Sequence, residues 1–173
     1  KKSAGTGAQK QSDAIKLLRN NGWFVFFENR KPDHAGTDSE RPKVSEKLFK
    51  AMAGLPTLTR VSLIDATYNC KVPIAPGWIK HLLALPKLTR LDFEGDRVSD
   101  EYLSLIDQFP HLNSIEIRRT KVTDKGLKKI AKCKSLDKIE WVSNPMTTKS
   151  GIQILQDRFP DAYLECYPKC LYE

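Results

Sequence analysis

Residues 88–111 read LTRLDFEGDRVSDEYLSLIDQFPH, and residues 112–135 read LNSIEIRRTKVTDKGLKKIAKCKS. The two stretches align without a gap, and their matched apolar pairs are Leu88/Leu112, Leu91/Ile115, Phe93/Ile117, Val98/Val122, Leu103/Leu127 and Ile106/Ile130. Self-similarity of this kind is typical of an array in which each unit buries its apolar face against the next unit. The repeat therefore predicts the architecture of the chain, and it favours binding over catalysis.

Each copy contains a strand pattern followed by a helix pattern. The first part alternates apolar and polar residues, as in Leu91, Asp92 and Phe93, which is typical of a short strand with one buried face. Ser99 and Asp100 follow, and we expect such a pair to cap the start of a helix. Because a strand, a helix and a parallel strand cross over right-handed, the sequence predicts an α/β fold. We expect a right-handed solenoid, or horseshoe, with a parallel sheet of about six strands on the concave side and helices on the convex side.

Imperfect copies and non-repetitive segments flank the two clear copies. Imperfect copies begin at Leu58 and Leu136, and Trp141 aligns with Phe93 and Ile117, so we expect its indole in the core. Before the repeats, the polar stretch 29–43 has no periodicity and is predicted to be a loop. The predicted divisions are a flexible basic tether (1–11), an N-terminal capping helix, strand, loop and helix (12–57), four repeats (58–161), and a closing strand with a tail (162–173).

The copy that begins at Leu58 is longer than the others, because additional residues separate its strand from its helix. These residues fall between Thr67 and Gly77 and include two prolines, which reduce the entropy lost when a loop becomes ordered. We expect an ordered loop, with Trp78 packed at its base and Tyr68 near the concave rim. Two roles stay open for this loop: an extension of the binding surface, or a patch over the core.

Residues 112–127 follow the pattern Leu-x-x-Ile-x-Ile-x-x-Thr-x-Val-Thr-Asp-x-Gly-Leu. This pattern resembles a leucine-rich repeat of the cysteine-containing, GALA-like kind, and the resemblance extends over residues 58–165. Similar short arrays, with a closing Phe/Leu-Pro-Asp segment like residues 159–161, are abundant in planctomycete-type bacteria. The resemblance implies a non-catalytic recognition scaffold.

A narrower resemblance is to the mitochondrial coupling factor B family. It is carried by Leu17-Leu18-Arg19 with the strand that follows, and by the segment Ile64-Asp65-Ala66-Thr67-x-x-Cys70. This resemblance implies a structural subunit or assembly factor of a larger complex, including one that associates with a membrane.

The composition fits a chain that buries a core without relying on disulfides. Hydrophobic residues make up 40% of the chain, and no apolar run reaches the length of a membrane span. The chain starts at Lys1 without a methionine, so an exported or tethered protein whose signal or anchor lies upstream is compatible with it. The compartment is left open.

The formal net charge of +8 raises the question of an anionic partner. Lysines crowd one repeat, and a nucleic acid or an anionic membrane surface would be attracted to them. The same residues also suit the solvated outer face of a helix, and no aromatic residue interleaves them as a stacking platform would require. The solvated face is therefore favoured over an anionic partner for Lys121, Lys125, Lys128, Lys129, Lys132 and Lys134.

Cysteine, histidine and serine patterns give no sign of catalysis or of metal binding. Cys133 falls at a helix-to-turn position where we expect burial, whereas Cys166 and Cys170 could pair in an oxidising compartment. A Cys-x3-Cys pair alone is a poor zinc site, and the histidines lie in different units. The chain also lacks Gly-x-Ser-x-Gly and a phosphate-loop motif. We therefore predict no enzyme activity, no cofactor and no metal.

The candidate binding residues follow from strand alternation. If Leu63, Phe93, Ile117 and Trp141 point into the core, the residues immediately before and after each of them on its strand point towards the concave face. A non-catalytic scaffold would bind another macromolecule there, and a protein is the favoured partner. The predicted partner-binding residues are Phe24, Phe26, Arg60, Ser62, Ile64, Tyr68, Arg90, Asp92, Glu94, Glu116, Arg118, Lys138 and Glu140.

One row of this predicted face carries like charges on adjacent strands. Asp92, Glu116 and Glu140 would repel one another at the strand spacing of about 4.8 Å. Two interpretations are kept: a partner supplies a basic group, or the row is neutralised by the basic residues beside it, which are Arg90, Arg118 and Lys138.

The N-terminal end of the same face is predicted to be apolar. If Val25 and Phe27 lie in the core, Phe24 and Phe26 point outward, and an exposed apolar patch usually marks a contact site. The alternative, which we weigh equally, is that the loop at 29–43 folds back and covers this patch.

Overall fold

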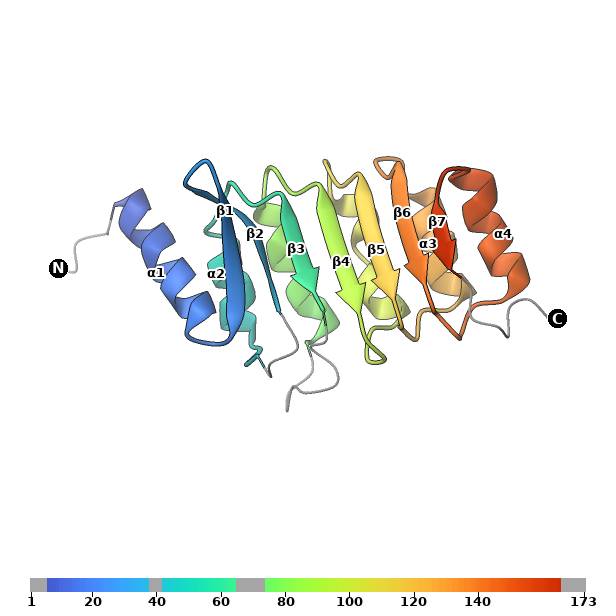
Figure 1. Ribbon diagram of the computed structural model, residues 1–173, viewed down its shortest axis with the longest axis horizontal. Coiled ribbons are helices and arrows are strands. Elements are labelled where there is room, and N and C mark those ends of the chain that lie inside the picture. Colours follow the sequence, from blue (N-terminus) through green and yellow to red (C-terminus); the bar gives the residue numbers. More distant parts are fainter. Residues whose placement is uncertain (1–5, 38–41, 65–73, 166–173) are drawn as a thin grey trace.

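A computed structural model describes residues 6–37, 42–64 and 74–165. Its centre is an open, seven-stranded, mostly parallel sheet whose strands follow chain order (Figure 1). Only the first two strands pair antiparallel. The strands are β1 (Trp23–Glu28), β2 (Lys31–Thr37), β3 (Arg60–Leu63), β4 (Arg90–Glu94), β5 (Ser114–Arg118), β6 (Lys138–Val142) and β7 (Tyr163–Glu165).

The helices lie along one face of this sheet (Figure 1). They form a row in which each packs on the next, with α1 at one end and α4 at the other. We call the opposite face of the sheet, which no described helix covers, the open face. The helical elements are α1 (Gly7–Arg19), α2 (Glu46–Met52), η1 (Pro76–Ala84), η2 (Asp100–Leu103), η3 (Ile106–Gln108), α3 (Asp124–Lys132) and α4 (Lys149–Arg158).

Strand pairing confirms the alignment of the sequence copies. Leu91 pairs with Ile115, and Phe93 pairs with Ile117, whose partner on β6 is Trp141. All five side chains are at most 1% exposed, so the predicted core position of Trp141 is confirmed. Burying a side chain of this size stabilises the fold by roughly 1.5–3 kcal/mol. The core between the sheet and the helices therefore continues from strand to strand.

The prediction of a loop over residues 29–43 is wrong, because this segment contains β2. Asn29 and Arg30 have φ values of 48° and 63°, and this tight turn returns the chain antiparallel to β1. Pro32 lies opposite Phe27, where the β1–β2 register shifts. A proline, which cannot donate a backbone hydrogen bond, is tolerated at such an irregularity. The polar sequence concealed this strand, and the sheet has seven strands rather than six.

The N-terminal helix starts earlier than predicted. Thr6 is its N-cap and accepts a hydrogen bond from the backbone N–H of Gln9 at 3.4 Å. Ser12, at the predicted start of the N-terminal helix, lies inside α1. The part of the predicted tether that the structure describes therefore belongs to α1.

Two of the predicted helices form 3-10 turns instead of α-helices. The segment around Ile79 forms η1, and the segment around Leu103 forms η2 and η3. A 3-10 helix rises about 2.0 Å per residue against 1.5 Å in an α-helix, so few residues can span the height of a strand. Ile79 and Leu103 are each 1% exposed, so the predicted apolar positions are buried despite the change of helix type.

An aspartate at the start of one helical segment also binds the start of the next. Asp100 accepts hydrogen bonds from the backbone N–H of Thr123 at 2.9 Å and from its hydroxyl at 2.7 Å. Asp124 binds Thr148 in the same way, at 2.9 and 2.7 Å. The hydroxyls of Thr123 and Thr148 in turn cap their own helices, which confirms the predicted cap at Thr123. Ser99, the cap predicted for the preceding segment, makes no side-chain capping hydrogen bond.

Glycines make room for these aspartates. A Cβ atom added to Gly151 would lie 2.1 Å from Oδ1 of Asp124, and one added to Gly126 would lie 2.4 Å from Oδ1 of Asp100. Because non-bonded heavy atoms do not approach this closely, any side chain at either position must displace the carboxylate from its threonine.

We expect Gly151→Ala to destabilise the protein by about 1–3 kcal/mol, because the added methyl group overpacks the Asp124 carboxylate. Alanine ordinarily stabilises a helix relative to glycine by about 1 kcal/mol, so the sign of the effect is diagnostic. Urea unfolding monitored by circular dichroism measures the change. Gly77→Ala in η1 is the matched control, since its Cβ meets nothing within 4 Å. A Gly151→Ala protein at least as stable as the wild type would contradict the steric account.

Candidate functional site

The open face brings most of the predicted binding residues together in three rows that cross the strands. Cα register defines the first row as Phe26, His34, Arg60, Arg90, Ser114 and Lys138. The central row is Phe24, Gly36, Ser62, Asp92, Glu116, Glu140 and Tyr163. The third row is Glu94, Arg118, Val142 and Glu165.

Two predicted residues do not belong to these rows. Ile64 follows the end of β3, and its carbonyl accepts a hydrogen bond from the hydroxyl of Thr37 at 2.5 Å. Tyr68 and most of the inserted loop lie outside the described residues. At the base of that loop, Trp78 packs against Phe49 with ring centroids 5.9 Å apart, which confirms the predicted position of its indole.

Asp92 lies at the centre of the open face and is 1% exposed. Its carboxylate accepts a hydrogen bond from the hydroxyl of Ser62, one from Nε of Arg60 at 2.6 Å and one from Nε of Arg90 at 2.7 Å. A buried carboxylate requires such partners to offset its lost hydration. Asp92 therefore fixes the orientation of two arginines that lie on adjacent strands.

The other carboxylates of the central row bind arginines of the same face. Glu116 contacts Arg90 at 2.8 Å and Arg118 at 2.7 Å, and Glu140 contacts Arg90 at 2.9 Å. Burial opposes the charge of Arg90, but its bonds to Asp92 and Glu140 raise the pKa of its guanidinium further above the usual value. The geometry thus favours neutralisation of the row from within the chain. Lys138, which was predicted to share this role, makes no ion pair within the described ranges.

Aromatic side chains occupy the β1–β2 end of the open face. The ring of Phe24 lies over Gly36, where a Cβ would be 2.7 Å from its Cζ atom, and contacts His34 with centroids 4.7 Å apart. Phe26 lies 5.0 Å from Phe24 and is 61% exposed. The predicted outward patch is present, and the alternative in which residues 29–43 cover it is wrong for the part described, because that part forms the neighbouring strand.

Phe27 does not lie in the core as predicted. It is 44% exposed and lies near the end of β1, where the register with β2 shifts between Phe26 and Phe27. Its ring lies under the guanidinium of Arg19, 5.3 Å from the centroid, on the α1 side of the strand. Phe27 is therefore separate from the patch on the open face.

Sequence reasoning missed His34 on this face. The hydroxyl of Ser62 gives its one proton to Asp92, so Nε2 of His34 donates to that oxygen at 2.7 Å. Burial, assisted by the charge of Arg60, lowers the pKa of His34 to about 4. The sequence signal that could have revealed His34 is the strand alternation around the buried Ala35. The prediction of a loop for this segment concealed it.

His34, Ser62 and Asp92 are the residue types of a catalytic triad in an order that does not suit catalysis. In a triad the histidine bridges the serine and the carboxylate and removes the serine proton. Here the serine is the bridging residue, its hydroxyl donates to the carboxylate, and the residue is 0% exposed. This arrangement holds the sheet and its arginines in place rather than activating a nucleophile.

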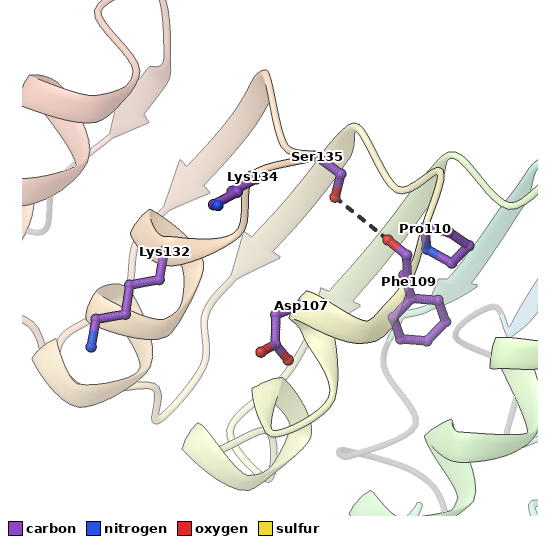
Figure 2. A pocket seen from close by; sticks show the side chains of 6 residues that line it. All are labelled: Asp107, Phe109, Pro110, Lys132, Lys134 and Ser135. Atoms are coloured by element: carbon purple, nitrogen blue, oxygen red, sulfur yellow. Dashed lines mark hydrogen bonds between the residues drawn. The ribbon is translucent and has the colours of Figure 1, made fainter.

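A pocket lies on the helix side of the molecule. It has a volume of about 360 Å³ and is lined by Asp107, Phe109, Pro110, Lys132, Lys134 and Ser135 (Figure 2). Ser135 donates a hydrogen bond to the carbonyl of Phe109 at 3.5 Å. Figure 2 shows the carboxylate of Asp107 and the two ammonium groups well apart, so the charged groups do not converge on a ligand position.

The remaining sequence expectations concern cysteines, metals and membranes. Cys133 is 1% exposed, which confirms its predicted core position, whereas Cys70, Cys166 and Cys170 lie outside the described residues. Across residues 6–37, 42–64 and 74–165, no three side chains of histidine, cysteine, aspartate or glutamate gather as metal ligands would. The helices of this same part are too short or too polar to cross a bilayer.

No family model matches the chain, and no curated protein matches it.

The lowered pKa of His34 predicts a pH dependence of stability. The folded state binds the His34 proton less tightly than the unfolded chain does. The contribution of His34 to the free energy of unfolding is therefore fully present above about pH 6.5 and is lost as the pH falls towards about 4. His34→Gln keeps a donor to Ser62 and does not titrate. Urea midpoints at neutral and acidic pH should therefore differ more in the wild type than in His34→Gln. An equal loss of stability in both proteins would contradict the assignment.

The central row also predicts unequal effects for two similar amide substitutions. Asp92→Asn places amide hydrogens against arginine donors in a buried position, and we expect a loss of about 2–3 kcal/mol. Glu140→Gln, at a side chain that is 38% exposed, should cost less than about 1 kcal/mol. Chemical denaturation at neutral pH measures both values. If the two costs were equal, Asp92 would not be the centre of the network.

Proposed function

We propose that this protein is a non-catalytic scaffold that binds a protein partner through the open face of its sheet. The observation that carries this proposal is an uncovered face on which exposed aromatic rings adjoin arginines already fixed by buried carboxylates. We also propose that the protein is a short right-handed solenoid of the leucine-rich repeat type, with the open face on its concave side.

Several features support the repeat architecture. Aligned residues of consecutive sequence copies pair on adjacent parallel strands, as Leu91 does with Ile115. The helical segments form a row on one side of the sheet, and the aspartate–threonine contacts recur from Asp100 to Thr123 and from Asp124 to Thr148. Contacts that recur with the repeat are expected of a stacked array.

The chemistry of the open face supports a binding role. Phe26 keeps more than half of its side chain in water although it lies beside two other rings. Arginine and aromatic residues are enriched among those that dominate the affinity of protein interfaces. Because Asp92 and Glu116 hold Arg60, Arg90 and Arg118 in one geometry, little side-chain entropy remains to be lost on binding.

The second candidate, a structural subunit or assembly factor, rests on the coupling factor B resemblance alone. Asp65 to Cys70, which carry half of that resemblance, lie outside the described residues. The two candidates differ in stoichiometry, because a structural subunit elutes with its complex at native expression whereas a recognition scaffold also occurs free.

Affinity capture from cells that express the protein tests the open face with a matched pair of double variants. Phe26→Ala/Lys138→Glu changes an exposed ring and an exposed lysine of the first row. Phe27→Ala/Lys128→Glu makes the same chemical changes outside the open face, on the α1 side of β1 and on α3. We expect the first variant to retain less than about a tenth of the captured partner, since two central contacts are removed.

The control variant should retain at least half of the captured partner, and both variants should melt within a few degrees of the wild type. If the control lost the partner and the open-face variant kept it, the binding surface would lie on the helix side and the proposal would fail.

A further inference from the structure

The first row of the open face differs from its neighbours in charge. It contains no carboxylate, and its members across β1 to β6 are aromatic, neutral or cationic: Phe26, His34, Arg60, Arg90, Ser114 and Lys138. The carboxylates all lie in the central and third rows. Charge is therefore segregated along one line of the sheet.

The carboxylates of the central row are already occupied. Asp92 accepts three hydrogen bonds and is 1% exposed, and Glu116 is held by two arginines. A basic partner would have to displace these arginines. The buried carboxylates would then lose the ion pairs that offset their lost hydration. The central row is thus a poor receptor for a cation.

The first row, by contrast, has cationic groups with unused donors. Lys138 is exposed, and its ammonium has no hydrogen bond or ion pair within the described residues. Arg60 binds Asp92 through Nε and lies 4.0 Å from Glu116 through one Nη, with 36% of its side chain exposed. Both cations can therefore donate hydrogen bonds to an incoming carboxylate and keep every existing contact that is shorter than 4.0 Å.

The spacing of these groups defines the size of a ligand. Arg60 lies two strands from Phe26, and Lys138 lies three strands further on. At about 4.8 Å per strand, the intervals are roughly 10 and 14 Å. An extended peptide that advances about 3.3 Å per residue crosses the whole row in about seven residues.

The mixed charge of the open face favours a peptide over a phosphate polymer or a membrane. A nucleic acid or an anionic bilayer presents closely spaced charges over a wide area. Either would also face the central and third rows, which carry Asp92, Glu94, Glu116, Glu140 and Glu165 against fewer cations. A partner with a few placed carboxylates avoids this repulsion.

Resting on the function proposed above, we propose that the partner presents an extended acidic segment of about seven residues with an aromatic side chain near one end. The aromatic side chain stacks on Phe24 and Phe26, and the carboxylates bind Arg60 and Lys138. His34 is uncharged at neutral pH and forms the floor between the two parts.

Selection from a displayed library of random octapeptides, with the full chain as bait, tests this partner chemistry. We expect enrichment of peptides that combine Asp or Glu with one Trp, Phe or Tyr. For a synthesised peptide from the selection, Phe26→Ala should weaken binding about tenfold or more, and Lys138→Glu about three- to tenfold. Phe27→Ala and Lys128→Glu should change the affinity less than twofold.

Each other outcome overturns this inference, and the outcomes separate it from the broader proposal. Enrichment of basic peptides that still depend on Phe26 refutes the acidic partner but leaves the open face as a binding surface. Peptides that depend on Lys128 and not on Phe26 refute both. Failure to enrich any peptide refutes the inference that the partner presents a short extended segment.

Two further probes address the other classes of anion. If a single-stranded oligoribonucleotide, or vesicles that contain phosphatidylserine, bound more tightly than the selected peptides and lost affinity with Lys138→Glu, the partner would be a phosphate surface instead of an acidic segment.

Discussion

The open face depends on the burial of one carboxylate. Asp92 has almost no contact with water, so its charge must be balanced by partners on its own strand and on the strand before it. Ser62 and Arg60 come from β3 and Arg90 from β4, and Arg90 continues the contacts to Glu116 and Glu140. Because these contacts together join β3, β4, β5 and β6, a change at Asp92 would reach four strands at once.

The apolar half of the fold could be predicted from the sequence because core burial follows period. Leu91, Phe93, Ile115 and Ile117 repeat the same alternation, and strands that pair in parallel preserve it. Trp141 was placed correctly for the same reason. Burial of the aligned positions is insensitive to helix type, so Ile79 and Leu103 were assigned to the core although their segments form 3-10 turns.

The errors lie where pairing overrides local composition. Pro32 and Gly36 argue against a strand in this polar stretch, yet β2 is fixed by neighbours on both sides, β1 and β3. The missed strand concealed His34, and Phe27, beside the register shift, lies on the helix side as expected but stays 44% exposed. The ion pairs of the face were foreseen only as a choice between two interpretations, because alternation gives the side of a residue and not the rotamer that selects its partner.

The glycines that admit Asp100 and Asp124 also make the central segment interchangeable. Residues 112–135 carry both a threonine that receives an aspartate from the preceding segment and an aspartate that reaches the following threonine. An extra copy spliced after residue 135 would present the correct group at both of its junctions, so the row of strands and helices could be lengthened without redesign of its ends. Lengthening stops at α4, where Lys149 stands in the position of Asp124 and offers no carboxylate to a successor.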